Sequence, residues 1–416
     1  MTTIASRARA LTWIVLFVGA SVYLFGTGGL AHDFSIFGIN FVPGTVESLS
    51  QARARPHGEV GAARTIILGP NLSCASIATS PHGRLVAVAE NDPGAVVLIS
   101  RRSGRLMSRF PMGCTSCVAF SPLGNCLAVA GSRNLLLPLR RDHFGKAIAI
   151  DAKTWKLQAS GQKDTKTYLT EERDVCFFRG GRRVALASGD RLGLYVVPKW
   201  LLAHGRPAGQ APPPGPLREL GSTDAYTPSS LRAVRGGHFF LIESGDVVRI
   251  DTNPLRNAWQ QFIPAEVSAL AVSPDAGRVI CVGTNSRLGP ESWIFNPLGS
   301  AIAAGGHGRE WFLNIGSGTI TRTRRSSTDF VAAVADQRGN EIALGLSWDS
   351  RIGGSSVVLI NPRSGRRNAT LTIPLGDRVT RAMCLTVDGR YVIAAYGHSQ
   401  ADPGAEVAKL LVWKVR

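Results

Sequence analysis

The sequence contains none of the short motifs that identify the common catalytic sites. It has no Gly-x-Ser-x-Gly elbow, no glycine-rich phosphate loop and no His-Glu-x-x-His pattern. Its eight histidines are scattered, and none is spaced from another histidine or a carboxylate as ligands on one structural element would be. We therefore expect no catalytic residue that local sequence can identify, no metal and no cofactor.

Cysteine spacing also gives no sign of a metal or redox site. Cys114 and Cys117 form a single Cys-x-x-Cys pattern, and no second pair completes a set of four ligands. A redox dithiol normally begins a helix, whereas this pair leads into an apolar strand. We interpret the seven cysteines as structural residues.

Long runs of one charge are absent as well, although the net charge is +18. Arginine supplies most of the 47 basic residues and is spread along the whole chain. We interpret this as general surface charge. A positive field can also attract anionic lipids or other polyanions, so contact with them through arginine stays an alternative, whereas nucleic acid is not an expected partner.

One hydrophobic run stands out, at the N-terminus. Residues Leu11 to Phe25 are apolar and follow Arg7 and Arg9. The run predicts a hydrophobic helix that serves as a signal anchor, or a signal peptide cleaved near Ala31. Because about 20 residues after it carry no Lys or Arg, the positive-inside rule places the rest of the chain outside the cytoplasm. We expect a single-pass membrane protein, or a secreted or periplasmic one after cleavage.

The remaining chain repeats one unit. After the N-terminal segment (1–31) and a turn-rich tether (32–62), residues 63–416 contain seven copies of an apolar strand, a tight turn and a second apolar strand. The turns are marked by Gly83, Gly124, Gly181, Gly236, Gly277, Gly339 and Gly389. A third apolar strand and a more polar fourth strand follow each copy, as in a half-exposed outer strand. Units of this kind, about 40–45 residues long at the shortest, are typical of propeller blades.

The ends of the chain complement each other. The last copy has room for strands at Tyr391–Tyr396 and Leu410–Val415 but not for a fourth strand. The segment Arg64–Leu68 precedes the first copy and has no partner of its own, so its addition to the last copy would close a ring. The sequence thus predicts an all-β, seven-bladed β-propeller whose N-terminal strand closes the last blade, preceded by one hydrophobic helix.

The repeats resemble those of a known family. Ser-Pro-x-Gly-x-x-Leu-Ala-Val-Ala and the terminal Leu410-Leu-Val-Trp413-Lys-Val are similar to WD40 and YVTN-type repeats over residues 64–416. The usual Gly-His and Trp-Asp pairs of WD40 repeats are missing, and Trp413-Lys414 stands in place of the latter. The resemblance implies a scaffold for interactions and transfers no catalytic residue, because propeller function resides in the loops.

Loop length distinguishes the two faces of the predicted disc. We expect four insertions between second and third strands, all on one face, at Ser132–Lys146, Asn285–Glu310, Ser347–Gly354 and Gly397–Ala408. Aromatic residues next to arginine are typical of binding hot spots. The predicted partner-binding residues are Arg140, Arg141, His143, Trp293, Phe295, Arg309, Trp348 and Arg351. The aromatic residues could instead pack the long loop onto its own blade.

Two functions remain open from the sequence. The first is a membrane-tethered platform that binds another protein through this face. The second is a hydrolase-like or lactonase-like propeller enzyme, or a small-ligand binder, acting at the mouth of the central channel. Its residues would be dispersed in sequence, and converging His, Asp, Glu and Arg side chains at the channel would indicate it.

Overall fold

The computed structural model of the protein describes most of the predicted propeller. The described residues are 34–36, 39–41, 64–70, 74–90, 94–112, 115–141, 147–150, 155–156, 173–188, 191–199, 219–223, 228–233, 238–243, 246–252, 255–263, 266–284, 293–295, 301–303, 308–326, 330–336, 339–349, 354–372, 378–385, 389–397 and 407–415. The predicted signal anchor lies outside them. Within these ranges, no helix is long and apolar enough to cross a membrane.

The chain forms two units, residues 1–47 and 48–416. In the first unit, β1 (Phe34–Ile36) pairs with β2 (Ile39–Phe41) as an antiparallel hairpin. This hairpin lies inside the segment 32–62 that the sequence predicts to be a turn-rich tether.

The second unit is built from antiparallel sheets of the predicted repeat. The first sheet contains β4 (Cys74–Thr79), β5 (Leu85–Glu90), β6 (Ala95–Ser100) and β7 (Leu106–Pro111), in that order. The turn from β4 to β5 is closed by Ser80, whose carbonyl oxygen accepts from the amide of Gly83 at 2.7 Å. The Ser80 hydroxyl also accepts from the amide of Leu85 at 3.1 Å. The serine of the repeat is therefore a turn former.

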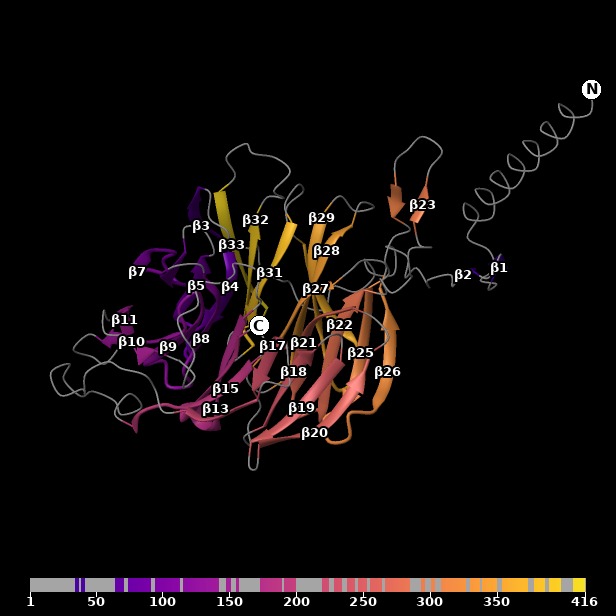
Figure 1. Ribbon diagram of the computed structural model, residues 1–416. Coiled ribbons are helices and arrows are strands. Elements are labelled where there is room, and N and C mark those ends of the chain that lie inside the picture. Colours follow the sequence, from indigo (N-terminus) through magenta and orange to yellow (C-terminus); the bar gives the residue numbers. More distant parts are fainter. Residues whose placement is uncertain are drawn as a thin grey trace, which may run out of the picture. The chain divides into compact units, whose positions relative to one another are not determined.

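Five more sheets have four strands each (Figure 1). Within each sheet the strands are given from the first strand outward. Two of these sheets contain β13 (Arg173–Phe178), β14 (Arg183–Ser188), β15 (Arg191–Val196) and β16 (Glu219–Thr223), and β17 (Pro228–Ala233), β18 (His238–Glu243), β19 (Asp246–Thr252) and β20 (Leu255–Phe262). The other three contain β21 (Glu266–Ser273), β22 (Arg278–Thr284), β25 (Gly308–Asn314) and β26 (Ile320–Arg325); β27 (Phe330–Ala335), β28 (Ile342–Asp349), β29 (Gly354–Ile360) and β30 (Arg367–Thr372); and β31 (Arg378–Leu385), β32 (Tyr391–Gly397), β33 (Val407–Lys414) and the N-terminal strand β3 (Arg64–Pro70). A short 3-10 helix, η1 (Arg179–Gly181), forms the turn between β13 and β14.

A further sheet follows the first one along the chain. It contains β8 (Thr115–Phe120), β9 (Cys126–Gly131), β10 (Leu135–Arg141) and β11 (Ala147–Ile150), and β12 (Trp155–Lys156) also pairs with β10. The first strands of the sheets contact one another in the cyclic order β4, β8, β13, β17, β21, β27, β31 and back to β4. This closed ring of antiparallel sheets is a β-propeller.

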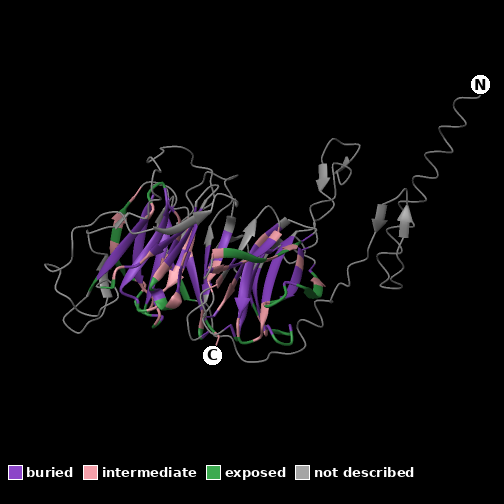
Figure 2. Ribbon diagram, turned by 60° about the horizontal axis from the view of Figure 1, so that its bottom comes forward, coloured by how far each residue is buried: buried purple, intermediate pink, exposed green. Residues whose placement is uncertain are grey.

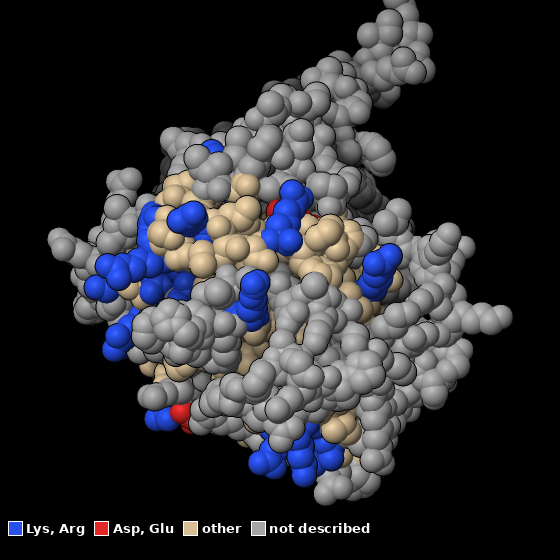
Figure 3. Space-filling model, turned by 90° about the vertical axis from the view of Figure 1, so that its left-hand side faces the viewer, with Lys and Arg blue, Asp and Glu red and all other residues tan. Residues whose placement is uncertain are grey.

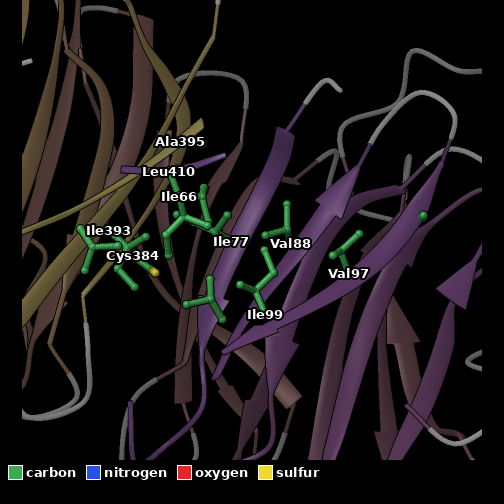
Figure 4. Close-up of a cluster of buried hydrophobic side chains, with 12 residues drawn as sticks. Ile66, Ile77, Val88, Val97, Ile99, Cys384, Ile393, Ala395 and Leu410 are labelled. Carbon is green, nitrogen blue, oxygen red and sulfur yellow. The ribbon is translucent and has the colours of Figure 1, made fainter. Parts of the chain in front are cut away.

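The N-terminal strand joins the last sheet, as the sequence predicts. β3 pairs antiparallel with β33, with Arg64 opposite Val412 and Ile66 opposite Leu410. The strand extends to Pro70, two residues beyond the predicted end. Figure 4 shows Ile66 beside Leu410 and Ile77, in a cluster that joins the first sheet to the last. This packing couples the two ends of the ring.

Burial follows the predicted gradient in the sheets whose outer strands have described burial (Figure 2). All residues of β5 and β9 are buried, because sheets pack against both of their faces. The outermost strand β7 alternates between exposed and half-buried residues. The core therefore consists of layers between adjacent sheets.

Candidate partner-binding face

The strand order defines two faces of the ring. Turns between first and second strands, and between third and fourth strands, lie on the face that we call the turn face. Connections between second and third strands, together with the links between sheets, lie on the opposite, inserted-loop face. On the turn face, neighbouring turns pack closely: a Cβ on Gly124 would lie 3.0 Å from Pro81, and one on Gly389 would lie 3.2 Å from Asp336.

Two of the four predicted insertions are long connections between second and third strands, whereas the one predicted at Ser347–Gly354 is reduced to residues 350–353, as short as the link of residues 91–94 between β5 and β6. The connection from β22 to β25 covers residues 285–307 and contains a hairpin of β23 (Trp293–Phe295) and β24 (Ala301–Ala303). The connections from β28 to β29 and from β32 to β33 cover residues 350–353 and 398–406. The inserted-loop face therefore has connections of very different lengths.

The insertion predicted at Ser132–Lys146 is wrong. Residues Ser132–Lys146 contain the third strand itself, β10, which pairs with β9 after a link of residues 132–134. The apolar run Ala147–Ile150 is the outer strand β11, which pairs with β10. Proline is rare inside a sheet, yet Pro138 lies within β10. It lies between residues paired with β12 and residues paired with β11, where no amide donor is needed toward the outer strand.

This correction moves two of the predicted binding residues to the other face. β10 runs toward the turn face, where the amide of Leu139 donates to the carbonyl oxygen of Asn125 at 2.9 Å. Arg140 and Arg141 follow directly and end the strand there. The structure therefore does not bring them together with the residues on the inserted-loop face.

The other predicted residues divide between the inserted-loop face and the parts of the chain that are not described. Trp293 and Phe295 form β23, Trp348 lies near the end of β28, and Arg309 is the second residue of β25 and is half-buried. All four positions belong to the inserted-loop face. His143 and Arg351 lie outside the described residues.

Two buried acidic residues near this face were not predicted from the sequence. Glu90 at the end of β5 pairs with Arg109 of β7 at 2.8 Å, and Glu310 of β25 pairs with Arg324 of β26 at 3.3 Å. Burial raises the pKa of Glu90, and the nearby Arg109 guanidinium opposes the rise. Each pair joins the outer strand to the interior of its own sheet, so these residues belong to the scaffold.

Many arginines near the turn face hold neighbouring sheets together. Their guanidinium groups donate to carbonyl oxygens in a turn of the next sheet: Arg249 to Ile315 at 3.1 Å, Arg278 to Pro362 at 3.2 Å, Arg322 to Ser364 at 2.8 Å, Arg64 to Arg101 at 3.5 Å and to Arg102. Part of the arginine content is therefore structural. Basic residues still dominate the charged surface of the described residues in Figure 3, the side where β7 and β10 lie.

The innermost strands carry one polar cluster. Asp174 of β13 accepts at 2.8 Å from the Cys117 thiol of β8, and at 2.8 Å from both the Leu231 amide and the Arg232 guanidinium of β17. Burial raises the pKa of the Cys117 and Cys176 thiols, so both stay protonated at neutral pH. Asp174 could not be recognised from local sequence, because its partners Leu231 and Arg232 lie 57 and 58 residues away.

This cluster is arranged for structure rather than for chemistry. Both carboxylate oxygens of Asp174 are occupied by donors from adjacent sheets, so neither oxygen is free to accept a proton from a substrate. Other innermost positions, such as Ala271 and Ala332, are small and apolar. No group of His, Cys, Asp and Glu among the described residues could hold a metal ion.

Comparisons with known proteins support the fold. No protein-family model matches the sequence, and no curated protein matches it. Among solved structures, the chain is similar to the crystal structure of the WD40 repeats of RRP9, with a TM-score of 0.56 and 10% sequence identity. The match covers 85% of this chain and 97% of the other. At this identity the likeness concerns the fold alone, and the chain has a WD40-type propeller fold.

Proposed function

We propose that the protein is an interaction platform: a seven-bladed propeller that binds another protein through its inserted-loop face. In this proposal the sheet of β8 to β12 counts as a blade beside the six four-stranded sheets, since all of them contact in one cyclic order. WD40-type propellers typically serve as interaction scaffolds.

The observation that carries the proposal is the difference between the two faces. Neighbouring turns on the turn face pack within van der Waals contact, as between Gly124 and Pro81. The inserted-loop face instead presents a separate hairpin, β23–β24, with Trp293 and Phe295 in one of its strands. Aromatic residues on connections that vary in length above a rigid ring are typical of a recognition surface.

Site-specific photo-crosslinking in cells tests this proposal. A photo-reactive amino acid at Trp293 probes the inserted-loop face, and the same amino acid at the exposed His82 probes the turn face. We expect protein adducts from position 293 that are absent from position 82. Equal adducts from both positions, or none from 293, would contradict a binding face at the inserted loops.

We further propose that the N-terminal segment attaches the platform to a membrane and places it outside the cytoplasm. The support is the sequence alone: an apolar run from Leu11 to Phe25 behind Arg7 and Arg9. The full chain should stay in the membrane fraction after alkaline carbonate extraction, whereas a variant lacking residues 2–31 should not. A mature N-terminus near residue 32, found by mass spectrometry, would instead indicate cleavage and a secreted or periplasmic protein.

The channel mouth is the less favoured site for a function. The polar cluster of Asp174, Cys117 and Arg232 on the innermost strands is satisfied by donors from neighbouring strands, and the proposal therefore assigns no enzymatic activity to Asp174, Cys117 or Cys176.

A further inference from the structure

Two arginines on β25 and β26 lack the acceptors that most of the described arginines near them have. Arg309 lies directly opposite Arg325 on the adjacent strand. Neither forms an ion pair with any acidic residue in the described part of the chain, and the Nε atom of Arg309 is buried without a hydrogen-bond partner there. Burial, and then the charge of Arg325, lowers the pKa of Arg309.

Glu310, which follows Arg309 in β25, does not neutralise Arg309 or Arg325. Side chains alternate along β25, so Arg309 lies on the same side as Trp311, which packs into the layer against β19 and β21. Glu310 points to the opposite side, where Arg324 neutralises it at 3.3 Å. Like charges directly opposite each other destabilise a sheet, and a buried polar atom without a partner adds to that cost.

An oxyanion would remove both penalties. Guanidinium groups bind carboxylates and phosphates through paired, charge-assisted hydrogen bonds, and the unpaired Nε is one of the donors that such a group would use. The site is accessible because Arg325 is exposed, while the half-buried Arg309 supplies a partly dehydrated charge. Partial dehydration strengthens the interaction with a bound anion.

The position of the pair identifies the source of the anion. Arg309 follows directly on the 285–307 connection, which holds Trp293, and Arg325 is the last residue of β26. Both therefore lie at the inserted-loop face. We propose that Arg309 and Arg325 together bind the carboxylate of an Asp or Glu side chain of the partner protein. This inference rests on the proposed function and names the chemistry of the partner at that face.

The first experiment tests the anion site without a partner. Inorganic phosphate, which presents similar oxygens, is added to the full chain at constant ionic strength, and the thermal unfolding midpoint is recorded for wild type, Arg309→Gln, Arg325→Gln and Arg105→Gln. Arg105 is an exposed residue near β7, so its variant has the same loss of charge elsewhere. Phosphate should raise the midpoint of wild type and Arg105→Gln, and much less that of the other two variants.

The stability of the variants without phosphate provides a second readout. Arg309→Gln should unfold at or above the wild-type midpoint, because it removes one of two unpaired like charges. An equal rise with phosphate in all four proteins would indicate general salt stabilisation and would overturn the anion site.

The second experiment tests the source of the anion. The yield of the protein adduct from position 293 should fall about tenfold in Arg309→Gln and Arg325→Gln, as expected for the loss of a charge-assisted hydrogen bond, and should not change in Arg105→Gln. An adduct of unchanged yield would overturn this inference and leave the platform standing. Phosphate binding with no adduct in wild type would overturn the platform, and with it the partner carboxylate.

Discussion

Replacing Gly339 by alanine tests how closely two neighbouring blades approach at the turn face. Gly339 has φ of +70°, and a Cβ at this position would lie 2.6 Å from the Cα of Ser273 and 2.8 Å from the Cδ of Pro274. Gly180 is a matched control: its φ is +66°, but a Cβ there would meet no atom within 4 Å. The two substitutions share the conformational cost and differ in the steric one.

The expected losses follow from these two costs. A left-handed conformation costs an alanine about 1–2 kcal/mol, which is the whole effect expected at Gly180. At Gly339 the backbone of the preceding blade must also move, and overpacking of this kind costs about 1–3 kcal/mol more. Equilibrium unfolding in urea should therefore give a lower free energy of unfolding for Gly339→Ala than for Gly180→Ala, by about 2 kcal/mol.

The comparison has a clear negative outcome. If both variants lose the same free energy of unfolding, the clash with Ser273 is not felt and close packing of adjacent turns does not stabilise the ring. The dependence of the free energy on urea should stay equal in both variants, because neither changes the surface exposed on unfolding.

Three further substitutions test other parts of the scaffold. Ile66→Ala in the closing strand should lower the free energy of unfolding by about 2–5 kcal/mol, because Ile66 is 3% exposed, whereas a change at Leu106, 56% exposed, should cost under about 0.5 kcal/mol in the same urea assay. Asp174→Asn should cost about 2–3 kcal/mol, since it leaves the Arg232 charge unpaired; a thermal midpoint equal to that of wild type would contradict this role. Burial raises the pKa of Glu90, so the folded protein binds a proton there more readily than the unfolded chain, and stability from this group falls as pH rises from the ordinary pKa of Glu to the raised one. Glu90→Gln should flatten that part of the pH–stability curve, and an unchanged slope would refute the assignment.

Local sequence was sufficient for the elements that repeat. The pattern of an apolar strand, a serine-containing turn with glycine and a second apolar strand predicts β4–β5 and β8–β9, because turn chemistry and continuous burial are both local properties. The closing strand was also predictable, since an unpaired strand at one end and an incomplete blade at the other must satisfy each other.

The third strand of the sheet formed by β8 to β12 was not predicted, because the tertiary structure accommodates a proline inside it. Pro138 argues against a strand interior, yet β10 passes through it. The outer strand of this sheet is divided into β11 and β12, and the proline lies opposite the gap between them. The predicted binding residues Arg140 and Arg141 consequently lie at the turn face.

The contacts that neutralise individual arginines depended on the fold alone. Arg322 reaches a carbonyl oxygen 42 residues away, and Arg232 reaches Asp174 across 58 residues. No periodicity in the sequence separates these arginines from Arg309 and Arg325, because the difference lies in which acceptors the adjacent strands and blades place within reach. The sequence by itself determined the repeat and the closure of the ring, while only the packing of strand on strand and blade against blade decided which charged side chains were neutralised and which were not.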